Sequence, residues 1–209
     1  MRIISGKYKG RTIKMPKGIR PTQDKVRKAL FDILGDIEGL SFLELFAGSG
    51  AVGIEALSRG AKEAVFVEKD KRCIEKIKQN LSVLAFSRSR VLALDAWVAI
   101  KQLGKAGGKL DIIFLDPPYY KRKVPRHYVS RSSLGDSGLA ETGEGDSLAK
   151  KTLQTLGAYD ILAPNGFIVV QHFKKDKLPG ESGQLVLVKE ARYGDTLLSF
   201  YRSEGRCVR

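Results

Sequence analysis

From residue 41 onward, short apolar runs alternate with segments of helical periodicity, and this alternation limits the possible folds more than any other feature. Strands are expected at 41–46, 64–70, 90–95, 110–116 and 166–173, and helices at 52–60, 71–84, 96–103 and 148–162. Strands separated by helices predict a parallel sheet with helices on both faces. Two further runs, 185–191 and 196–202, are joined by a turn at Gly194 and predict an antiparallel addition at one edge. The sequence therefore predicts an α/β fold with a mostly parallel, seven-stranded sheet.

Residues 1–38 precede this alternation and predict a small basic extension. The runs 2–4 and 11–15 have β-like composition around a Gly-containing connection, which favours a hairpin. Apolar residues at helical spacing then occupy 22–37. We therefore divide the chain into the extension and a main domain of residues 39–209.

The helix of the extension has recognisable start signals. Thr22 is the expected N-cap, and Asp24 falls in the first turn, where a negative charge is favourable. Lys25, Arg27 and Lys28 are expected to face outward, because the apolar positions form the opposite face.

The formal net charge is +14, and two stretches account for all of it. Residues 1–28 hold ten basic side chains and one acidic one, and residues 121–131 hold five basic side chains and no acidic one. Two basic patches on a neutral body favour a polyanionic partner, most simply nucleic acid. The alternative is a solvated basic arm without a partner. Residues 130–147 are rich in Ser, Gly and acid, and a mobile insertion is therefore predicted at 121–147.

Several classes of protein do not fit the composition. The two cysteines, Cys73 and Cys207, form no CxxC pair, so a reducing cytoplasm is the expected location. The two histidines lie in unrelated contexts, and no metal site is expected. No apolar run approaches the length of a membrane span, and residues 1–10 lack the apolar block of a secretory signal.

The first parallel strand ends in a glycine-rich turn at Gly48 and Gly50. These glycines allow a tight turn and a close approach of a ligand to the backbone amides, next to the N-terminus of the following helix. Gly53 completes a G-x-G-x-x-G pattern, so a dinucleotide site is also possible, although a lone match is a weak signal. A glycine turn that only joins strand to helix is the structural alternative.

Acidic residues end the next three strands at Glu68, Asp95 and Asp116. A carboxylate at the first position can accept ribose hydroxyls, and one at the second can accept an adenine amine. Each also has a structural explanation, as a solvated acid, a helix N-cap or the start of a proline turn. All of them lie at the same edge of one sheet, which favours a shared site.

Together, E-x-F-x-G-x-G, the two strand-end acids and Asp-Pro-Pro-Tyr at 116–119 resemble the S-adenosylmethionine-dependent methyltransferases that modify exocyclic amines of nucleobases, which have a Rossmann-like fold. With RIISGKYKGR, RPTQDKVRKALFDIL and RYGDTLLSFYR, nearly the whole chain resembles the RsmD-type guanine-N2 methyltransferases of small-subunit (16S) ribosomal RNA. Residues 121–150 depart from the resemblance, because they are longer than the family's usual loop.

The resemblance implies roles for individual residues. S-adenosylmethionine is expected at Glu44, Phe46, Ala47, Gly48, Gly50, Glu68, Asp95 and Ala96. Glu44 would lie near its methionine end, Glu68 at the ribose, and Asp95 with Ala96 at the adenine. The catalytic turn is Asp116, Pro117, Pro118 and Tyr119. The Asp116 carboxylate and the Pro117 carbonyl would each accept an amine hydrogen, and the target base would stack on Tyr119.

The expected partner is ribosomal RNA or an assembling small ribosomal subunit, bound by a monomer. Candidate RNA contacts are Arg2, Lys7, Lys9, Arg11, Arg20, Arg27, Lys121, Arg122 and Lys123. An adenine-N6 methyltransferase acting on DNA or RNA is the main alternative, because the Asp-Pro-Pro-Tyr turn suits both amines. A nicotinamide-dependent oxidoreductase and a non-catalytic RNA-binding protein are weaker alternatives, since neither explains all strand-end motifs.

Overall fold

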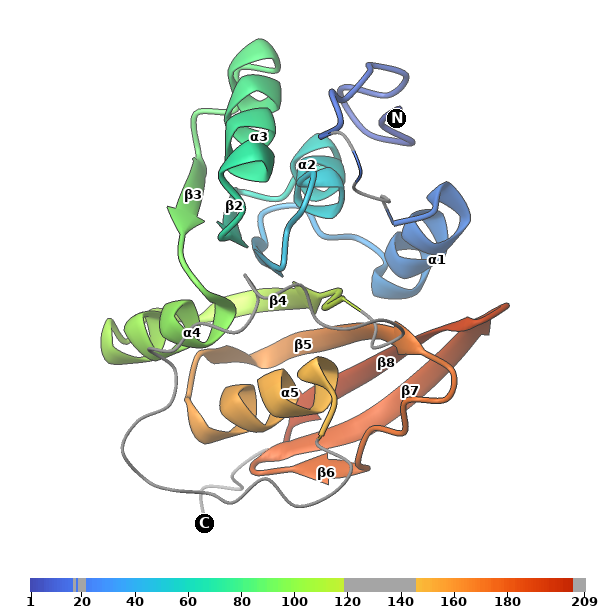
Figure 1. The fold of residues 1–209 in the computed structure, drawn as a ribbon, viewed down its shortest axis with the longest axis vertical. Helices are drawn as coiled ribbons and strands as arrows, with labels where there is room; N and C mark the ends of the chain where they lie inside the picture. The colour runs from blue at the N-terminus through green and yellow to red at the C-terminus, as the bar shows by residue number, and fades with distance from the viewer. Residues whose placement is uncertain (17, 19–21, 119–145, 205–209) are drawn as a thin grey trace.

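The computed structural model describes residues 1–16, 18, 22–118 and 146–204, and the predicted insertion at 121–147 therefore lies almost wholly outside the described residues. Figure 1 shows the ribbon. The helices are α1 (Asp24–Leu34), α2 (Ala51–Ser58), α3 (Lys71–Val83), α4 (Ala96–Lys105) and α5 (Leu148–Ala158). The strands are β1 (Ser41–Leu45), β2 (Glu63–Glu68), β3 (Ser89–Ala93), β4 (Leu110–Leu115), β5 (Leu162–Phe173), β6 (Glu181–Ser182), β7 (Leu185–Tyr193) and β8 (Thr196–Ser203).

The described strands form one sheet in the order β3-β2-β1-β4-β5-β8-β7-β6. Strands β1 to β5 pair in parallel, and β8, β7 and β6 extend the sheet antiparallel from β5. The prediction of a mostly parallel sheet with an antiparallel addition is confirmed. The structure has eight strands rather than seven, because β6 is two residues long and too short to show a sequence period. Helix α5 also ends earlier than predicted, at Ala158, where the next residue takes an extended conformation.

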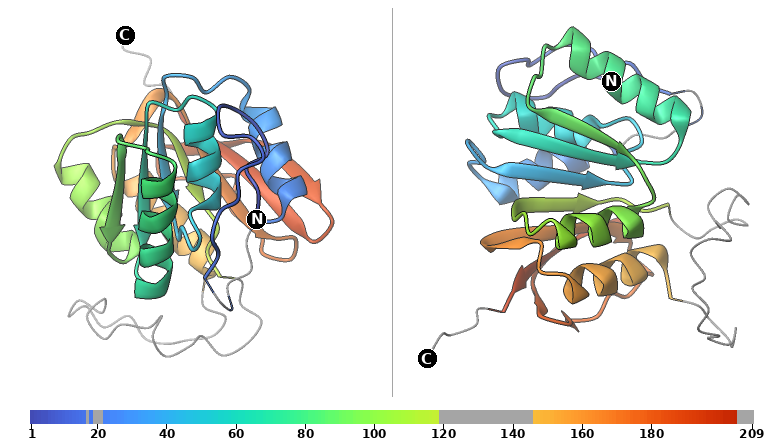
Figure 2. Two further views of the ribbon diagram at one scale, coloured as in Figure 1. Left: turned by 90° about the horizontal axis from the view of Figure 1, so that it is seen from above. Right: turned by 90° about the vertical axis from the view of Figure 1, so that its left-hand side faces the viewer.

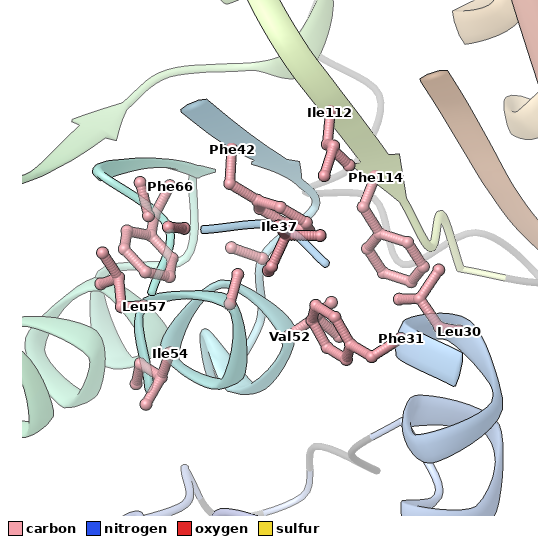
Figure 3. Close-up of a cluster of buried hydrophobic side chains, with 14 of the residues drawn as sticks. Leu30, Phe31, Ile37, Phe42, Val52, Ile54, Leu57, Phe66, Ile112 and Phe114 are labelled. Carbon is pink, nitrogen blue, oxygen red and sulfur yellow. The ribbon is translucent and has the colours of Figure 1, made fainter. Parts of the chain in front are cut away.

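Helices cover both faces of the sheet, as Figures 1 and 2 show. Helices α1, α2 and α3 pack on one face, and α4 and α5 pack on the other. On the first face, Phe42, Phe66 and Phe114 of the sheet meet Val52 of α2 and Phe31 of α1 (Figure 3). Burial of such large apolar side chains stabilises the fold by about 1.5–3 kcal/mol for each side chain.

Side-chain alternation decides which face each strand-end residue shares. Phe42, Phe114 and Val169 belong to the cluster under α1 and α2. Two positions further along their strands, the alternation places Glu44, Asp116 and Gln171 toward the same helices. Three polar residues from β1, β4 and β5 therefore share one face of the sheet.

The extension is packed against the main domain and does not stand apart from it as a separate hairpin. Its two β-like runs pair antiparallel through a bridge between Arg2 and Thr12 and backbone hydrogen bonds from Ile3 to Arg11 at 2.9 Å and from Ile13 to Met1 at 2.7 Å, although the pairing is too short to form regular strands. Glu55 of α2 accepts the backbone N–H groups of Ile4 and Ser5 at 2.8 and 2.9 Å. A Cβ on Gly6 would lie 1.8 Å from a carbonyl oxygen of α2, so only glycine permits this approach.

Two predictions about the first helix are wrong. The N-cap of α1 is Gln23, without a side-chain cap, whereas the Thr22 hydroxyl donates to Asp116 Oδ2 at 3.3 Å. Arg27 does not face outward. Its side chain is fully buried, donates to the Arg2 carbonyl at 2.6 Å and lies 3.7 Å from the buried Glu55 carboxylate. A pattern of apolar positions cannot show that a charged residue has a buried partner elsewhere in the chain.

Within the described part of the chain, every helix is too short or too polar to cross a bilayer.

Candidate active site

The turn after β1 holds several residues in left-handed backbone conformations. Phe46, Gly48 and Gly50 have φ values of 57°, 53° and 72°. Gly50 is also the N-cap of α2. A positive φ is uncommon for an aromatic residue and persists only where the surrounding structure enforces it. The turn is therefore a constrained element at the carboxyl edge of the sheet.

Glu68 at the end of β2 holds this turn in place. Its carboxylate is 5% exposed and accepts N–H groups from Gly48 at 2.8 Å, Lys69 at 2.8 Å and Asp70 at 2.9 Å. A carboxylate has about four acceptor positions, so these bonds leave about one for a ligand hydroxyl. A second hydroxyl would have to displace one of the backbone donors.

Asp95 has the N-cap role that was the structural alternative. Its Oδ1 accepts the N–H of Trp97 at 3.1 Å, in the first turn of α4. Its Oδ2 lies 3.2 Å from the ammonium of Lys69, which follows β2. A cap and a ligand contact are compatible, because the two oxygens of one carboxylate can serve different donors.

A shallow pocket, open to solvent, lies between these two acids. It is lined by Phe46, Val67, Glu68, Lys69, Leu94, Asp95 and Ala96. Apolar walls with carboxylates at one side fit a nucleoside, whose base is flat and apolar and whose sugar carries hydroxyl donors. Four predicted cofactor residues thus line one pocket. Val67, Lys69 and Leu94 were missed, although they flank the predicted acids in sequence.

Glu44 was predicted at the methionine end of the cofactor, and in the structure it caps α2. Its carboxylate is 3% exposed and accepts the N–H groups of Val52 at 3.3 Å and Gly53 at 2.9 Å. The pKa of Glu44 is raised to about 8, mainly by burial and in part by the nearby Asp116, against the opposing effect of the two backbone hydrogen bonds. A Cβ on Gly53 would lie 2.5 Å from the Phe66 ring and 2.9 Å from Glu44 Oε2, so this glycine permits the helix to approach. Close packing thus explains the third glycine of the G-x-G-x-x-G match.

Asp116 receives hydrogen bonds from two distant parts of the chain. Its Oδ2 accepts from Gln171 Nε2 at 2.9 Å and from Thr22 Oγ1 at 3.3 Å. The register pairs Leu115 with Val170, which places Asp116 beside Gln171 on the neighbouring strand. Gln171 was missed by the sequence reasoning. The available signal was a polar residue inside the apolar run of β5.

Of the remaining turn residues, Pro117 is buried and Pro118 is exposed. Tyr119, the predicted stacking residue, lies outside the described residues. The predicted RNA contacts Arg20, Lys121, Arg122 and Lys123 lie there as well.

The basic side chains of the extension separate into two groups. Arg2, Lys7, Lys9 and Arg11 are exposed, as an RNA contact requires. The Lys7 ammonium and the Arg11 guanidinium lie 5.4 and 5.5 Å from the centre of the Tyr8 ring. Arg27 is buried in the ion pair with Glu55, so its prediction as an RNA contact is corrected.

Comparison with known proteins gives the family. The model of the family described as "Conserved hypothetical protein 95" matches residues 1–136. "Putative rRNA methyltransferase YlbH" of Bacillus subtilis is 35% identical over 209 residues, which cover 98% of this chain and 100% of that protein. The chain therefore belongs to the family described as "Conserved hypothetical protein 95". "Ribosomal RNA small subunit methyltransferase D" of Haemophilus influenzae is 31% identical over 97% of this chain and 94% of its own length. The RsmD-type resemblance is therefore confirmed.

Solved structures agree with the fold. "Putative methyltransferase yhhF" from Escherichia coli superposes with a TM-score of 0.77 at 30% identity, covering 99% of each chain. The Streptococcus mutans protein described as "a putative sam-dependent methyltransferase" has a TM-score of 0.63 at 16% identity, over 88% of this chain and 49% of that one. The architecture of the chain is that of the S-adenosylmethionine-dependent methyltransferases.

Proposed function

We propose that this protein is an S-adenosylmethionine-dependent methyltransferase that modifies the exocyclic N2 amine of a guanine in small-subunit ribosomal RNA. The observation that supports this most is the position of Asp116-Pro117-Pro118 at the end of β4. This turn adjoins the glycine-rich turn of β1 at the edge of the sheet where the pocket between Glu68 and Asp95 opens. The rRNA methyltransferases among the relatives agree in substrate class.

The pocket residues hold the cofactor in this proposal. The Glu68 carboxylate accepts a ribose hydroxyl, and Asp95 and Ala96 face the adenine. Phe46 and Leu94 provide apolar walls. When bound there, S-adenosylmethionine supplies an electrophilic methyl group, so the chain has no need of a strong base of its own.

The residues of the β4 turn position the nucleophile. The lone pair of an exocyclic amine is delocalised into the base, so its two N–H groups must be held to direct the lone pair toward the methyl donor. Asp116 accepts one amine hydrogen, and the Pro117 carbonyl, which belongs to a residue with a fixed φ, accepts the other. The Thr22 and Gln171 donors fix the orientation of the Asp116 carboxylate. After transfer, the amine is cationic and releases a proton to Asp116 or to water.

Recognition of the RNA is assigned to the extension of residues 1–38, through Arg2, Lys7, Lys9 and Arg11. Their exposed charges suit phosphate contacts, which position an RNA without reading its sequence. Extensive packing of this segment on α2 supports a fixed orientation of these charges relative to the β4 turn. The proposed partner is ribosomal RNA or an assembling small subunit, and the proposed active form is a cytoplasmic monomer.

The test is to incubate the protein with methyl-labelled S-adenosylmethionine and small-subunit ribosomal RNA, both free and assembled, and to digest the product to nucleosides. Labelled N2-methylguanosine is the expected product. N6-methyladenosine would replace the proposed substrate with the adenine alternative. Absence of label in any nucleoside, with the cofactor bound, would contradict the proposed function.

A further inference from the structure

The amide oxygen of Gln171 has no hydrogen-bond partner among the described residues, although it is buried. The residue is 6% exposed, and its Oε1 lacks a partner, while Nε2 donates to Asp116 Oδ2 at 2.9 Å. This hydrogen bond fixes the orientation of the amide, because a flipped amide would place two acceptor oxygens together. A buried acceptor without a partner is rare in proteins and indicates a missing ligand or water.

The position of this oxygen is informative because it adjoins the proposed catalytic carboxylate. Gln171 lies on β5 and Asp116 directly follows the neighbouring β4, and the alternation from Val169 and Phe114 places both toward the face that α1 covers. A base whose amine reaches Asp116 would bring its neighbouring ring atom toward Gln171. The chemistry of that ring atom differs between the candidate substrates.

In guanine, the N2 amine lies between N1–H, which is a hydrogen-bond donor, and N3, which is an acceptor, so a base whose N1 edge faces Gln171 offers a donor. In adenine, the N6 amine lies next to N1, which is an acceptor, and N3 of cytosine is likewise an acceptor beside the N4 amine. An unpartnered acceptor beside the amine site therefore matches guanine and opposes the other two bases, because facing acceptors would remain desolvated without a hydrogen bond.

We infer that Gln171 determines base specificity, its Oε1 accepting the N1–H of the target guanine while its Nε2 orients Asp116. This inference rests on the proposed function and deepens it, since the Asp-Pro-Pro-Tyr turn alone does not distinguish the amines. The Gln171 Oε1 atom is buried in the structure, so its contact with a base requires the surrounding atoms to move when the base enters. Of the two donors to Asp116 Oδ2 among the described residues, Thr22 makes the longer contact, at 3.3 Å.

The experiment compares two target bases that both carry the amine. Once the wild-type protein has been used to map the methylated nucleotide, RNAs are prepared by ligation with either guanine or 2-aminopurine at that position. 2-Aminopurine keeps the amine at C2, but its N1 is an acceptor without hydrogen. The kcat/KM for each RNA is measured for the wild-type protein, Gln171→Met and Thr22→Val.

The wild-type protein is expected to prefer guanine. Gln171→Met should reduce this preference by roughly 10- to 100-fold, as expected from one buried hydrogen bond to the substrate. The variant also loses the contact with Asp116, but this loss slows methylation of both RNAs alike and cancels in the ratio of their kcat/KM values. The two bases differ in intrinsic amine reactivity, and this difference cancels when the ratio for the variant is compared with that for the wild-type protein. Thr22→Val is the matched control, because it removes another described donor to Asp116 Oδ2 and leaves the Gln171 amide in place. It should slow both RNAs and leave the preference unchanged.

The outcomes separate the inference from the proposed function. If the wild-type protein labels no guanine, the proposed function fails and the inference fails with it. If guanine is labelled but Gln171→Met keeps the wild-type preference, only the inference is overturned. An equal fall in preference for Thr22→Val would also overturn it, because the effect would then come from Asp116. Unchanged thermal unfolding and cofactor titration of both variants exclude misfolding as the cause.

Discussion

The two halves of the carboxyl edge hold their acidic side chains in different ways. At the pocket between β2 and β3, the partners of Glu68 and Asp95 include backbone N–H groups one or two residues away in sequence. At the end of β4, Asp116 binds Thr22 and Gln171, which are 94 and 55 residues away. The first half depends mainly on local turns, and the second half depends on the assembled sheet and extension.

This difference has a physical consequence for how each half responds to change. A carboxylate held by its own turn keeps its geometry as long as that turn is formed. A carboxylate held by distant donors keeps its geometry only when the strand register and the packing of the extension are both correct. We expect substitutions in the first half to affect mainly cofactor binding and those in the second to affect mainly methyl transfer.

The largest expected effect is that of Asp116→Ala. Removal of the carboxylate that orients the amine should lower kcat for methyl transfer by about 10²–10⁴-fold, the range observed for positioned catalytic groups. Cofactor affinity should stay within about 2-fold, because Asp116 does not line the pocket. Calorimetric titration with S-adenosylmethionine and a methyl-transfer assay measure the two quantities. Normal turnover would remove Asp116 from the mechanism.

Glu68→Gln tests the other half. The amide keeps the shape of the side chain and loses the charge. Its NH₂ group faces one of the three backbone N–H donors without forming a hydrogen bond, so cofactor affinity should fall by roughly 10- to 100-fold. Glu63→Gln, at the opposite end of the same strand, is the matched control for the loss of charge. If Glu68→Gln and Asp116→Ala weakened the cofactor equally, the division into two halves would be wrong.

Gly53→Ala tests the packing that brings α2 to Glu44. The added methyl group would meet Phe66 at 2.5 Å and Glu44 at 2.9 Å, so the free energy of unfolding should fall by about 1–3 kcal/mol. Gly108→Ala is the control, because a Cβ there has no atom within 4 Å. Urea unfolding of both variants gives the comparison, and equal stability would show that α2 can move away without cost.

The stability of the protein is also expected to depend on pH through Glu44. Because the pKa of Glu44 is raised to about 8 from an ordinary value of 4.5, the folded state binds a proton between these values that the unfolded state has lost. The free energy of unfolding should therefore fall as pH rises through this window, by at most about 1.4 kcal/mol per pH unit from this group.

Glu44→Gln removes this titration. The free energy of unfolding of the wild-type protein, measured relative to that of the variant, should therefore fall between pH 6 and pH 8. Urea unfolding at several pH values measures it. A constant difference across this range would show that Glu44 is ionised in the folded protein. The exposed Glu38→Gln is the matched control for the loss of one carboxylate at the surface.

The sequence determined the alternation of strands and helices, and therefore the parallel sheet and the edge at which its acids gather. Glu68 and Asp95 were predictable because each has a backbone partner two residues further along the chain, so part of the turn and cap chemistry is present in the local sequence. The two-residue strand β6 was not predictable, because so short a segment has no period.

Only the tertiary structure decided the partners of Arg27 and Asp116. Arg27 resembles an exposed helix residue until α2 brings the buried Glu55 carboxylate to it. Thr22 resembles an N-cap until the extension brings its hydroxyl to Asp116. Gln171 is one polar residue in an apolar strand until the register places it beside Asp116. In each case the deciding interaction joins residues far apart in sequence, and only strand register and packing bring such residues into contact.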